Sequence, residues 1–246
     1  MVITYPKWLL FGDSITQRSF CAGGLGQHLA DTYVRKIDIV NRGYGGYNSR
    51  WGLHVLPLAK SKQPLKAINI WWGANDATLP MRPQSIPVAE FKKNLNALID
   101  MLQSPDSAYY SPDTIIILLS PPPICVPQRQ EEVRRLWGDV KLDRTAERTK
   151  EFADATEEVA KQRRIGFVPV FDAMMAAAGP SPDEGLRKLL CDGLHLTATG
   201  YQVVTDAFMK VIQRDYTDIA PDNMPRIFPE WGQIDPQSPE AAFPRA

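Results

Sequence analysis

The sequence predicts an α/β protein built as a three-layer α/β/α sandwich, in which a five-stranded parallel sheet lies between two layers of helices. Short apolar runs alternate with longer amphipathic segments, the pattern of buried parallel strands joined by helical crossovers. The chain has 246 residues, of which 44% are apolar and 23% charged, so it can bury the core of one compact unit. The expected strands are residues 7–11, 37–40, 67–72, 114–119 and 166–170.

Three segments predict helices that cover this sheet. Residues 88–102 place their apolar side chains on one helical stripe, so this helix should pack on the sheet. Residues 139–164 contain no proline and carry a thinner apolar stripe, which indicates a solvent-facing helix. Apolar side chains also recur at helical spacing over residues 201–212, after Thr197 and Gly200, and predict a final helix.

The proline distribution divides the chain into one folded domain, residues 1–220, and a tail, residues 221–246. Proline cannot sustain a helix, so we expect the tail to be extended and packed on the surface of the domain. The tail contains six prolines: Pro221, Pro225, Pro229, Pro236, Pro239 and Pro244.

Charge and metal-ligand patterns exclude several function classes. The 28 basic and 28 acidic residues are interspersed, which argues against binding to nucleic acid or to a membrane surface. Three cysteines without CxxC spacing and three histidines without HxxxH spacing argue against a disulfide framework and a zinc site. The apolar run at residues 8–11 is too short for a signal peptide. We therefore expect a cytoplasmic protein that needs neither metal nor organic cofactor.

Reactive side chains follow the first three predicted strands. Because the carboxyl ends of parallel strands meet at one edge, these loops should converge if the strand order is 2-1-3-4-5, which is flavodoxin-like. Strand one then lies between strands two and three, so a serine is flanked by a glycine-rich loop and an asparagine-bearing loop. Acyl transfer needs that layout, because the nucleophile and the donors for an oxyanion must be neighbours. The loops are Gly12-Asp13-Ser14, residues 41–46 and residues 73–76.

His195 is the candidate base for this serine. Asp192 lies three residues before it and can fold back onto the imidazole Nδ1, which would hold the ring in one tautomer. His28 and His54 fall inside helical patterns and are interpreted as ordinary helix residues. The sequence therefore predicts a catalytic triad of Ser14, His195 and Asp192.

Four short blocks together resemble the signature of the GDSL/SGNH hydrolases, and they occur in the order of that family. The likeness extends over residues 7–216, which implies that residues 1–220 form an SGNH hydrolase domain. The blocks are Phe-Gly-Asp-Ser at 11–14, Asn41 with Gly46, Gly73-x-Asn75-Asp76, and Asp192-x-x-His195.

The resemblance implies a role for each matching residue. Ser14 would be the nucleophile, His195 the base and Asp192 the group that orients it. The oxyanion would be bound by the Ser14 and Gly46 N–H groups and by the Asn75 side chain. Catalysis of this kind needs no cofactor.

Longer stretches are similar to one branch of that family, the fungal isoamyl acetate-hydrolysing esterases. These stretches include residues 42–51, 73–77 and 83–88, and the tail residues Asn223 and Trp231. The likeness implies hydrolysis of short-chain acetate esters such as isoamyl acetate. The expected partner is thus a small-molecule ester, and the sequence leaves a homodimer open.

Residues 121–137 match nothing in that branch, so the resemblance leaves the substrate preference open. The loop after strand four is well placed to form a wall of the pocket, and the shape of the pocket would decide which acyl and alcohol groups are accepted. The side chains expected to line the pocket are Trp72, Pro121, Pro122, Ile124, Val126 and Leu194.

Other functions fit parts of the pattern. A carbohydrate deacetylase, a lysophospholipase or a thioesterase would use the same residues with a different pocket. A binding protein that has lost catalysis is disfavoured, because all the reactive residues are present. A nucleotide-binding protein would need a GxxxxGK[ST] or GxGxxG loop after strand one, and neither follows it.

Structural roles compete with the catalytic ones at single positions. Ser14 could cap the helix that follows strand one, and the glycines of residues 43–46 could serve only a left-handed turn. Asn75 could fix a turn through its side chain. We expect Asp13 and Asp76 to have such loop-fixing roles.

Overall fold

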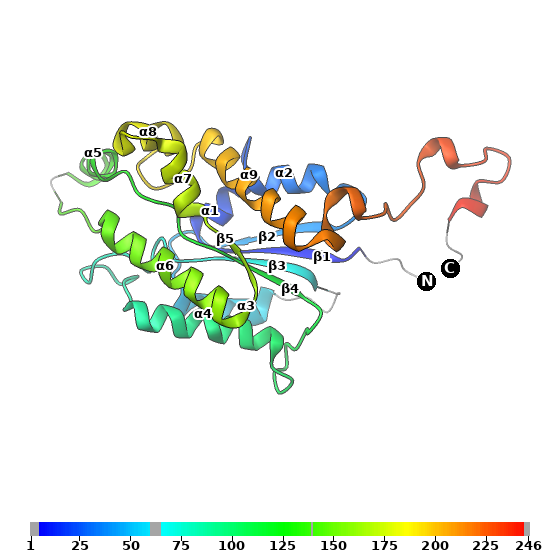
Figure 1. The fold of residues 1–246 in the computed structure, drawn as a ribbon, viewed down its shortest axis with the longest axis horizontal. Coiled ribbons are helices and arrows are strands. Elements are labelled where there is room, and N and C mark those ends of the chain that lie inside the picture. Colours follow the sequence, from blue (N-terminus) through cyan, green and yellow to red (C-terminus); the bar gives the residue numbers. More distant parts are fainter. Residues whose placement is uncertain (1–4, 60–64, 139, 244–246) are drawn as a thin grey trace.

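A computed structural model of the chain, described over residues 5–59, 65–138 and 140–243, contains a parallel sheet in the order β2-β1-β3-β4-β5. The sheet lies between two layers of helices (Figure 1). The three-layer fold and the strand order predicted from the sequence are therefore confirmed. The strands are β1 (Lys7–Gly12), β2 (Asp38–Gly43), β3 (Leu65–Trp71), β4 (Ile115–Leu119) and β5 (Gly166–Val168).

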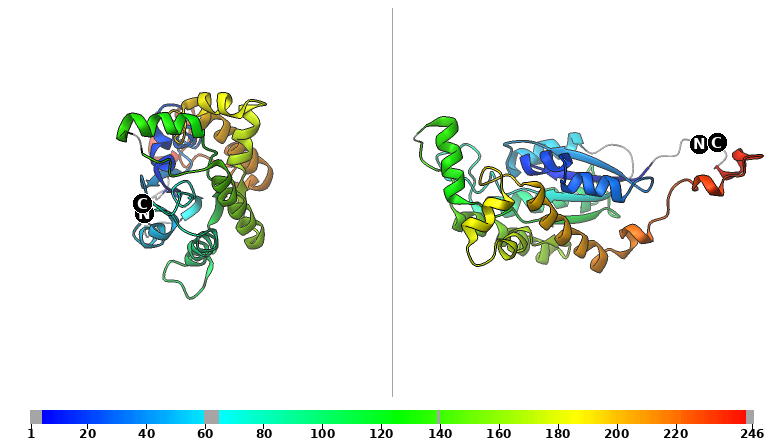
Figure 2. Two further views of the ribbon diagram at one scale, coloured as in Figure 1. Left: turned by 90° about the vertical axis from the view of Figure 1, so that its left-hand side faces the viewer. Right: turned by 90° about the horizontal axis from the view of Figure 1, so that it is seen from above.

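Each face of the sheet carries its own helical layer. One layer contains α2 (Leu25–Thr32), α7 (Val170–Ala178), α8 (Pro182–Leu189) and α9 (Ala198–Asp215), and the other contains α3 (Ser49–Ala59), α4 (Val88–Gln103) and α6 (Ala146–Arg163). Figure 2 shows the same layers from two further sides. Two helices lie at the end of the sheet where the strands finish (Figure 1), namely α1 (Ser14–Gln17) and α5 (Val126–Trp137).

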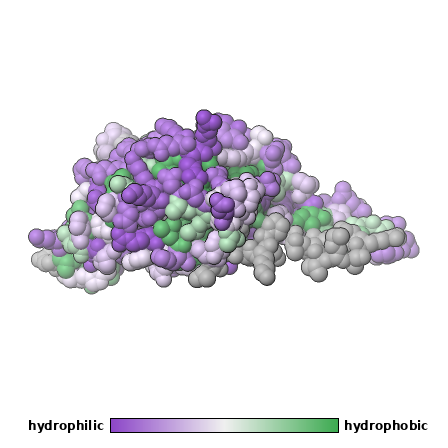
Figure 3. Space-filling view, turned by 90° about the horizontal axis from the view of Figure 1, so that it is seen from below, coloured by the Kyte–Doolittle hydropathy of each residue, from purple (hydrophilic) through white to green (hydrophobic). Residues whose placement is uncertain are grey.

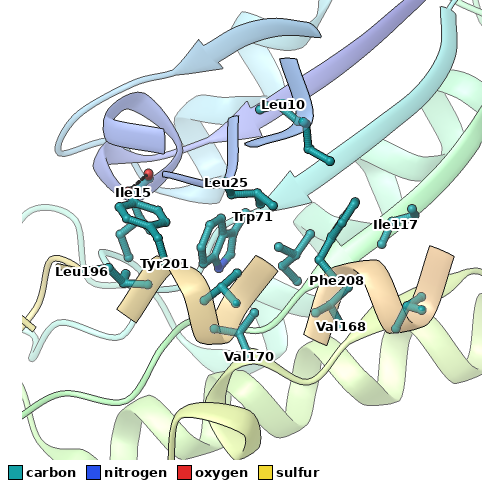
Figure 4. Packing of buried hydrophobic residues seen from close by; sticks show 14 of the residues in the cluster. Leu10, Ile15, Leu25, Trp71, Ile117, Val168, Val170, Leu196, Tyr201 and Phe208 are labelled. Atoms are coloured by element: carbon teal, nitrogen blue, oxygen red, sulfur yellow. Dashed lines mark hydrogen bonds between the residues drawn. The ribbon is translucent and has the colours of Figure 1, made fainter. Parts of the chain in front are cut away.

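The strands divide their side chains between two separate cores. Trp8 and Leu10 of β1 pack in the core under α9, while Leu9 and Phe11 pack in the core under α4. This alternation follows from the two-residue repeat of an extended chain. Figure 4 shows the first core, in which side chains of the sheet meet Phe208 and Tyr201 of α9. Because both faces are covered, the inner strands β1, β3 and β4 are mainly apolar, whereas the edge strand β2 carries Asp38, Asn41 and Arg42.

Several element boundaries differ from the prediction for local reasons. Helix α4 matches the expected segment, but α6 begins only at Ala146, because the Thr145 hydroxyl accepts a hydrogen bond from the Arg148 N–H at 3.1 Å and caps the helix. Residue 139, where that helix was expected to start, lies outside the described residues. Strand β2 continues to Gly43, so residues 41–43 are strand rather than loop. Val170 begins α7 instead of ending β5.

The tail leaves the body at the end of the sheet where the strands begin (Figure 1). It contains three short 3₁₀ turns, η3 (Pro221–Asn223), η4 (Trp231–Gln233) and η5 (Pro239–Ala242). The Arg35 guanidinium donates to the Phe228 carbonyl at 2.9 Å and to the Pro229 carbonyl at 2.5 Å, which ties the start of the tail to the body. The boundary at residue 220 remains a prediction. Beyond these bonds the described part of the tail projects away from the body (Figure 1), whereas the sequence predicted that it would pack on the surface.

Polar side chains predominate on the face of the molecule drawn in Figure 3. Throughout the part of the chain that the structure describes, the helices are too short or too polar to cross a bilayer.

Candidate active site

Ser14 is placed by a tight turn at the end of β1. The Asp13 carboxylate accepts the Ile15 N–H at 2.9 Å and caps α1, so Ser14 is the first residue of that helix and not its cap. A Cβ at Gly12 would come within 2.3 Å of Thr16 Oγ1 and of the Trp71 carbonyl, so only glycine lets the turn lie this close to β3. The Ser14 side chain is therefore free to face the cavity that it lines.

His195 reaches the same point from the loop between α8 and α9. Its Nε2 lies 2.9 Å from Ser14 Oγ, and its Nδ1 lies 2.7 Å from Asp192 Oδ2. The other carboxylate oxygen, Asp192 Oδ1, accepts the backbone N–H groups of Leu194 at 3.0 Å and His195 at 2.7 Å. The three residues predicted as a triad thus form one continuous chain of hydrogen bonds.

The environment of Asp192 favours its ionised form. Burial acts to raise the pKa of this carboxyl, but hydrogen bonds from the His195 ring and backbone outweigh burial and hold the pKa well below its ordinary value. A carboxylate at this position makes Nδ1 the protonated ring nitrogen and leaves Nε2 as an acceptor toward the serine hydroxyl.

Gly193 sets the course of the loop that holds Asp192 and His195. Its φ is +79°, a left-handed conformation, and a Cβ there would lie 2.4 Å from the Arg129 nitrogen and 2.7 Å from the Cys125 carbonyl. The Cys125 N–H donates to the Gly193 carbonyl at 3.0 Å. The loop is therefore docked on the N-terminal turn of α5, which fixes the position of the imidazole.

Gly46 and Asn75 line the cavity beside Ser14. Gly46 has a φ of +80° and no heavy atom within 4 Å of where a Cβ would be, so its backbone borders open space. Among the described residues, the N–H groups of Gly46 and Ser14 have no hydrogen-bond acceptor. These N–H groups can therefore donate to a bound molecule.

The Asn75 amide is held in one orientation from both ends. Its Nδ2 donates to the Tyr47 carbonyl at 2.8 Å, and its Oδ1 accepts from Arg144 Nη2 at 3.1 Å. An amide nitrogen carries two hydrogens, so the second N–H of Asn75 remains available at the cavity. Arg144 is a residue that sequence reasoning missed, and no motif marks it.

The neighbouring aspartates hold the loops, in line with the roles expected for them. Asp76 accepts the Ser49 N–H at 2.8 Å and the Gly73 N–H at 3.1 Å. Burial raises the pKa of Asp13 to about 7 and that of Asp76 to about 6, although the N–H groups that they bind act in the opposite direction. Within the described ranges, no three histidine, cysteine or acidic side chains are arranged to hold a metal ion.

The cavity has a volume of about 580 Å³, within the range of small-molecule sites. Leu194 lines it, as predicted from the sequence, but the other five residues expected in the pocket do not. Trp72 is only 1% exposed because its ring packs edge-on against Phe11, with centroids 5.2 Å apart. Pro121, Pro122 and Ile124 are buried, and Val126 is half-buried at the start of α5.

The remaining lining comes from segments that the sequence did not mark as functional. The loop between β3 and α4, helix α5 and the segment before α6 supply these side chains, most of them polar or charged. Those used below are Arg82, Arg129, Asp143 and Arg144, together with Arg18 at the end of α1.

Sequence comparison identifies relatives over nearly the whole chain. The model of the GDSL-like lipase/acylhydrolase family matches residues 10–203. A GDSL esterase/lipase of Arabidopsis thaliana is 38% identical over 97% of this chain and 97% of its own. The isoamyl acetate-hydrolyzing esterase of Saccharomyces cerevisiae is 32% identical over 94% of this chain and 95% of its own.

Solved structures share the fold at lower identity. A lipase/acylhydrolase from Enterococcus faecalis superimposes with a TM-score of 0.63 and 23% identity, over 90% of this chain and 98% of that one. A carbohydrate acetylesterase family member from Sinorhizobium meliloti gives a TM-score of 0.60 and 21% identity, over 85% of this chain and 97% of that one. At these identities the likeness extends to the fold alone.

Proposed function

The chain belongs to the GDSL-like lipase/acylhydrolase family and is a carboxylic ester hydrolase, and we propose that it cleaves short-chain esters, acetates above all, through an acyl-enzyme formed on Ser14. The observation that carries this proposal is the hydrogen-bond chain from Ser14 Oγ through the His195 ring to Asp192, at 2.9 Å and 2.7 Å. A serine hydroxyl becomes a nucleophile when a positioned base takes its proton, and this chain provides one.

In the first step, Ser14 Oγ attacks the ester carbonyl carbon while His195 Nε2 takes the hydroxyl proton. The C–O bond to the alcohol then breaks, and the imidazolium gives that proton to the leaving alkoxide. In the second step, water loses a proton to His195 and attacks the acyl-serine, which releases the carboxylic acid and restores the hydroxyl. Asp192 stabilises the imidazolium in both steps and stays ionised.

The negative charge of each tetrahedral intermediate needs donors that are already in place. We assign these donors to the N–H groups of Ser14 and Gly46 and to the second N–H of Asn75, all of which border the cavity. Because the Tyr47 carbonyl and Arg144 hold the Asn75 amide, its orientation need not change during the reaction. Such preorganised donors supply a large part of the rate enhancement in acyl transfer.

The preference for short acyl groups rests on the relatives. The yeast enzyme is named for the hydrolysis of isoamyl acetate, and rat and human homologues with that name are 33% and 32% identical over 98% of this chain. We propose the same class of substrate here, a short carboxylic ester of a small alcohol.

Initial rates with p-nitrophenyl esters from acetyl to palmitoyl test the function, and release of isoamyl alcohol from isoamyl acetate tests the named substrate. We expect kcat/KM to fall steeply as the acyl chain lengthens. Ser14→Ala should remove activity toward every ester. Ser181→Ala is a matched control, because Ser181 is exposed and its hydroxyl caps nothing.

Two results would contradict the proposal separately. Full activity of Ser14→Ala would refute the acyl-enzyme. A rate that rises with chain length would refute the short-chain preference and favour a lysophospholipase or thioesterase.

A further inference from the structure

The catalytic cavity carries an excess of positive charge. Among the residues that the structure describes, its lining includes four arginines, Arg18, Arg82, Arg129 and Arg144, but only one carboxylate, Asp143. When Asp192 behind the imidazole is also counted, these described side chains still carry two more positive charges than negative ones. Arginine stays protonated in proteins, so this excess persists at every physiological pH.

Asp143 is shared between two of these arginines. It accepts from Arg82 Nε at 2.5 Å and from Arg144 Nη1 at 2.9 Å, and it is 5% exposed. Burial acts to raise the pKa of Asp143, but the two guanidiniums outweigh burial and lower it. A single carboxylate cannot neutralise both cations, so the pair retains a net positive charge.

Arg129 is less well paired still. It is 7% exposed, and the only hydrogen bond that its side chain makes within the described chain is a long one, 3.4 Å from Nη1 to Asp192 Oδ2. That oxygen already accepts the His195 Nδ1–H at 2.7 Å. The Nε of Arg129 is buried without any partner among the described residues. A buried cation with so little compensation is costly to the fold.

Arg82, Arg129 and Arg144 are here called the arginine cluster, and the first two lie close enough to Arg144 to repel it. Burial lowers the pKa of Arg144, the charge of Asp143 opposes this, and the charges of Arg129 and Arg82 lower the pKa further. Like charges are brought together in a partly buried cavity only at a cost in stability. A bound anion would remove that cost.

We infer that the preferred substrates are esters that carry an anionic oxygen group, a carboxylate or a phosphate. Because the acyl group proposed above is acetyl, this anion belongs to the alcohol side of the scissile bond. The guanidinium fork matches the planar carboxylate and the phosphate in geometry, and such bonds are stronger than neutral ones. With the ester carbonyl at Ser14, the anion would be bound by Arg129 and its neighbours in the same cavity. This inference rests on the proposed function and names the substrate class for it.

The test compares three acetates that share their reacting bond: 4-acetoxybutanoate, 3-acetoxypropyl phosphate and the neutral 4-acetoxybutanamide. Released acetate is measured at low and at high ionic strength. We expect kcat/KM to be at least about tenfold higher for one or both anions than for the amide, mainly through a lower KM. Added salt should reduce this ratio. The favoured anion identifies the group that the cluster binds.

The ratio of kcat/KM for an anionic substrate to kcat/KM for the neutral amide also tests the residues. A substitution that weakens catalysis in general lowers both values equally and leaves this ratio unchanged. Arg129→Gln should bring the ratio toward one, and Arg129→Lys, which keeps the charge, should retain part of it. Arg187→Gln is the matched control. It removes the same charge from α8, where Arg187 pairs with Glu131 outside the cavity, and the ratio should not change.

Failure of the inference is distinct from failure of the proposed function. If the wild-type enzyme hydrolyses the amide as well as both anions, or if Arg129→Gln leaves the ratio intact, the inference is overturned while Ser14-dependent esterase activity stands. If none of the three acetates is hydrolysed in a Ser14-dependent way, the proposed function falls with it.

Discussion

The two parts of the cavity are built in different ways. Ser14, Gly46 and Asn75 follow the ends of three adjacent strands, and the backbone hydrogen bonds of the sheet determine their spacing. The arginine cluster comes from two loops and one helix outside the sheet, and side-chain pairs such as Arg82 with Asp143 hold it. The nucleophile and the assigned oxyanion donors, here called the rigid part, thus lie at the strand ends, whereas the residues assigned to substrate selection lie outside the sheet.

The largest loss of activity is expected from removing the base, His195, which contacts Ser14 of the rigid part from the loop between α8 and α9. His195→Gln should lower kcat by about 10³-fold or more and leave KM nearly unchanged, because the proton acceptor for Ser14 is lost while the cavity wall is kept. Steady-state kinetics with p-nitrophenyl acetate measure this. His28→Gln, an exposed substitution on α2, is the control. A loss below about tenfold would mean that another group serves as base.

Asn75→Ala tests the rigid part through its binding of the oxyanion. We expect kcat to fall by about 10²-fold to 10³-fold, because one of the three assigned donors disappears. Asn96→Ala, which removes an amide bonded only to the α4 backbone and to Arg163, is the matched control. A rise in KM at constant kcat would instead assign Asn75 to ground-state binding.

The buried carboxylates make the rigid part sensitive to pH. The folded-state pKa of Asp13 is raised to about 7, against 3.8 for the free side chain, so the unfolded chain loses its proton first as the pH rises. Folding stability from this group is therefore complete below pH 4 and is lost as the pH rises toward 7. Asp13→Asn keeps an acceptor for the Ile15 N–H and cannot ionise.

Urea unfolding at pH 5 and pH 8 measures this contribution. The free energy of unfolding of Asp13→Asn, relative to that of the wild type, should rise by about 3 kcal/mol between pH 5 and pH 8. A stability difference that is the same at both pH values would show that Asp13 is ionised throughout.

Arg144 joins the two parts, and its effect should be the smallest. Arg144→Gln should lower kcat by about fivefold, because the Asn75 amide loses its fixed orientation. In the Asn75→Ala background the same substitution should cost less, with a coupling energy of about 1 kcal/mol in a double-mutant cycle. Simple additivity would show that Arg144 acts on the substrate alone and does not position Asn75.

The rigid part could be predicted from the sequence because topology alone places it. Once five buried strands are recognised, the order 2-1-3-4-5 brings the loops after β1, β2 and β3 to one edge. The position of His195 followed from a different feature, the spacing between it and a nearby carboxylate. The apolar strands and the Asp192–His195 spacing are both patterns that can be recognised within a few consecutive residues of the sequence.

The rest of the cavity depends on tertiary packing. Trp72 was expected in the pocket, but it follows β3 on the side of the sheet that faces α3 and α4 and packs in that core. Pro121 is buried against Gly73, where a Cβ would lie 2.9 Å from its ring. Conversely, Arg129 and Arg144 lie in segments with no signature, and only the docking of α5 and the segment before α6 turns them toward the cavity.

The tail departs from the end of the sheet where the strands begin (Figure 1), whereas the cavity is lined by Ser14, Gly46 and Asn75, which follow the other ends of the strands. A tether attached near Trp231, which is 86% exposed, would therefore stand well clear of the cavity mouth. The protein could be anchored to a bead or fused to a second domain through this end, and ester and product would still diffuse freely to and from Ser14.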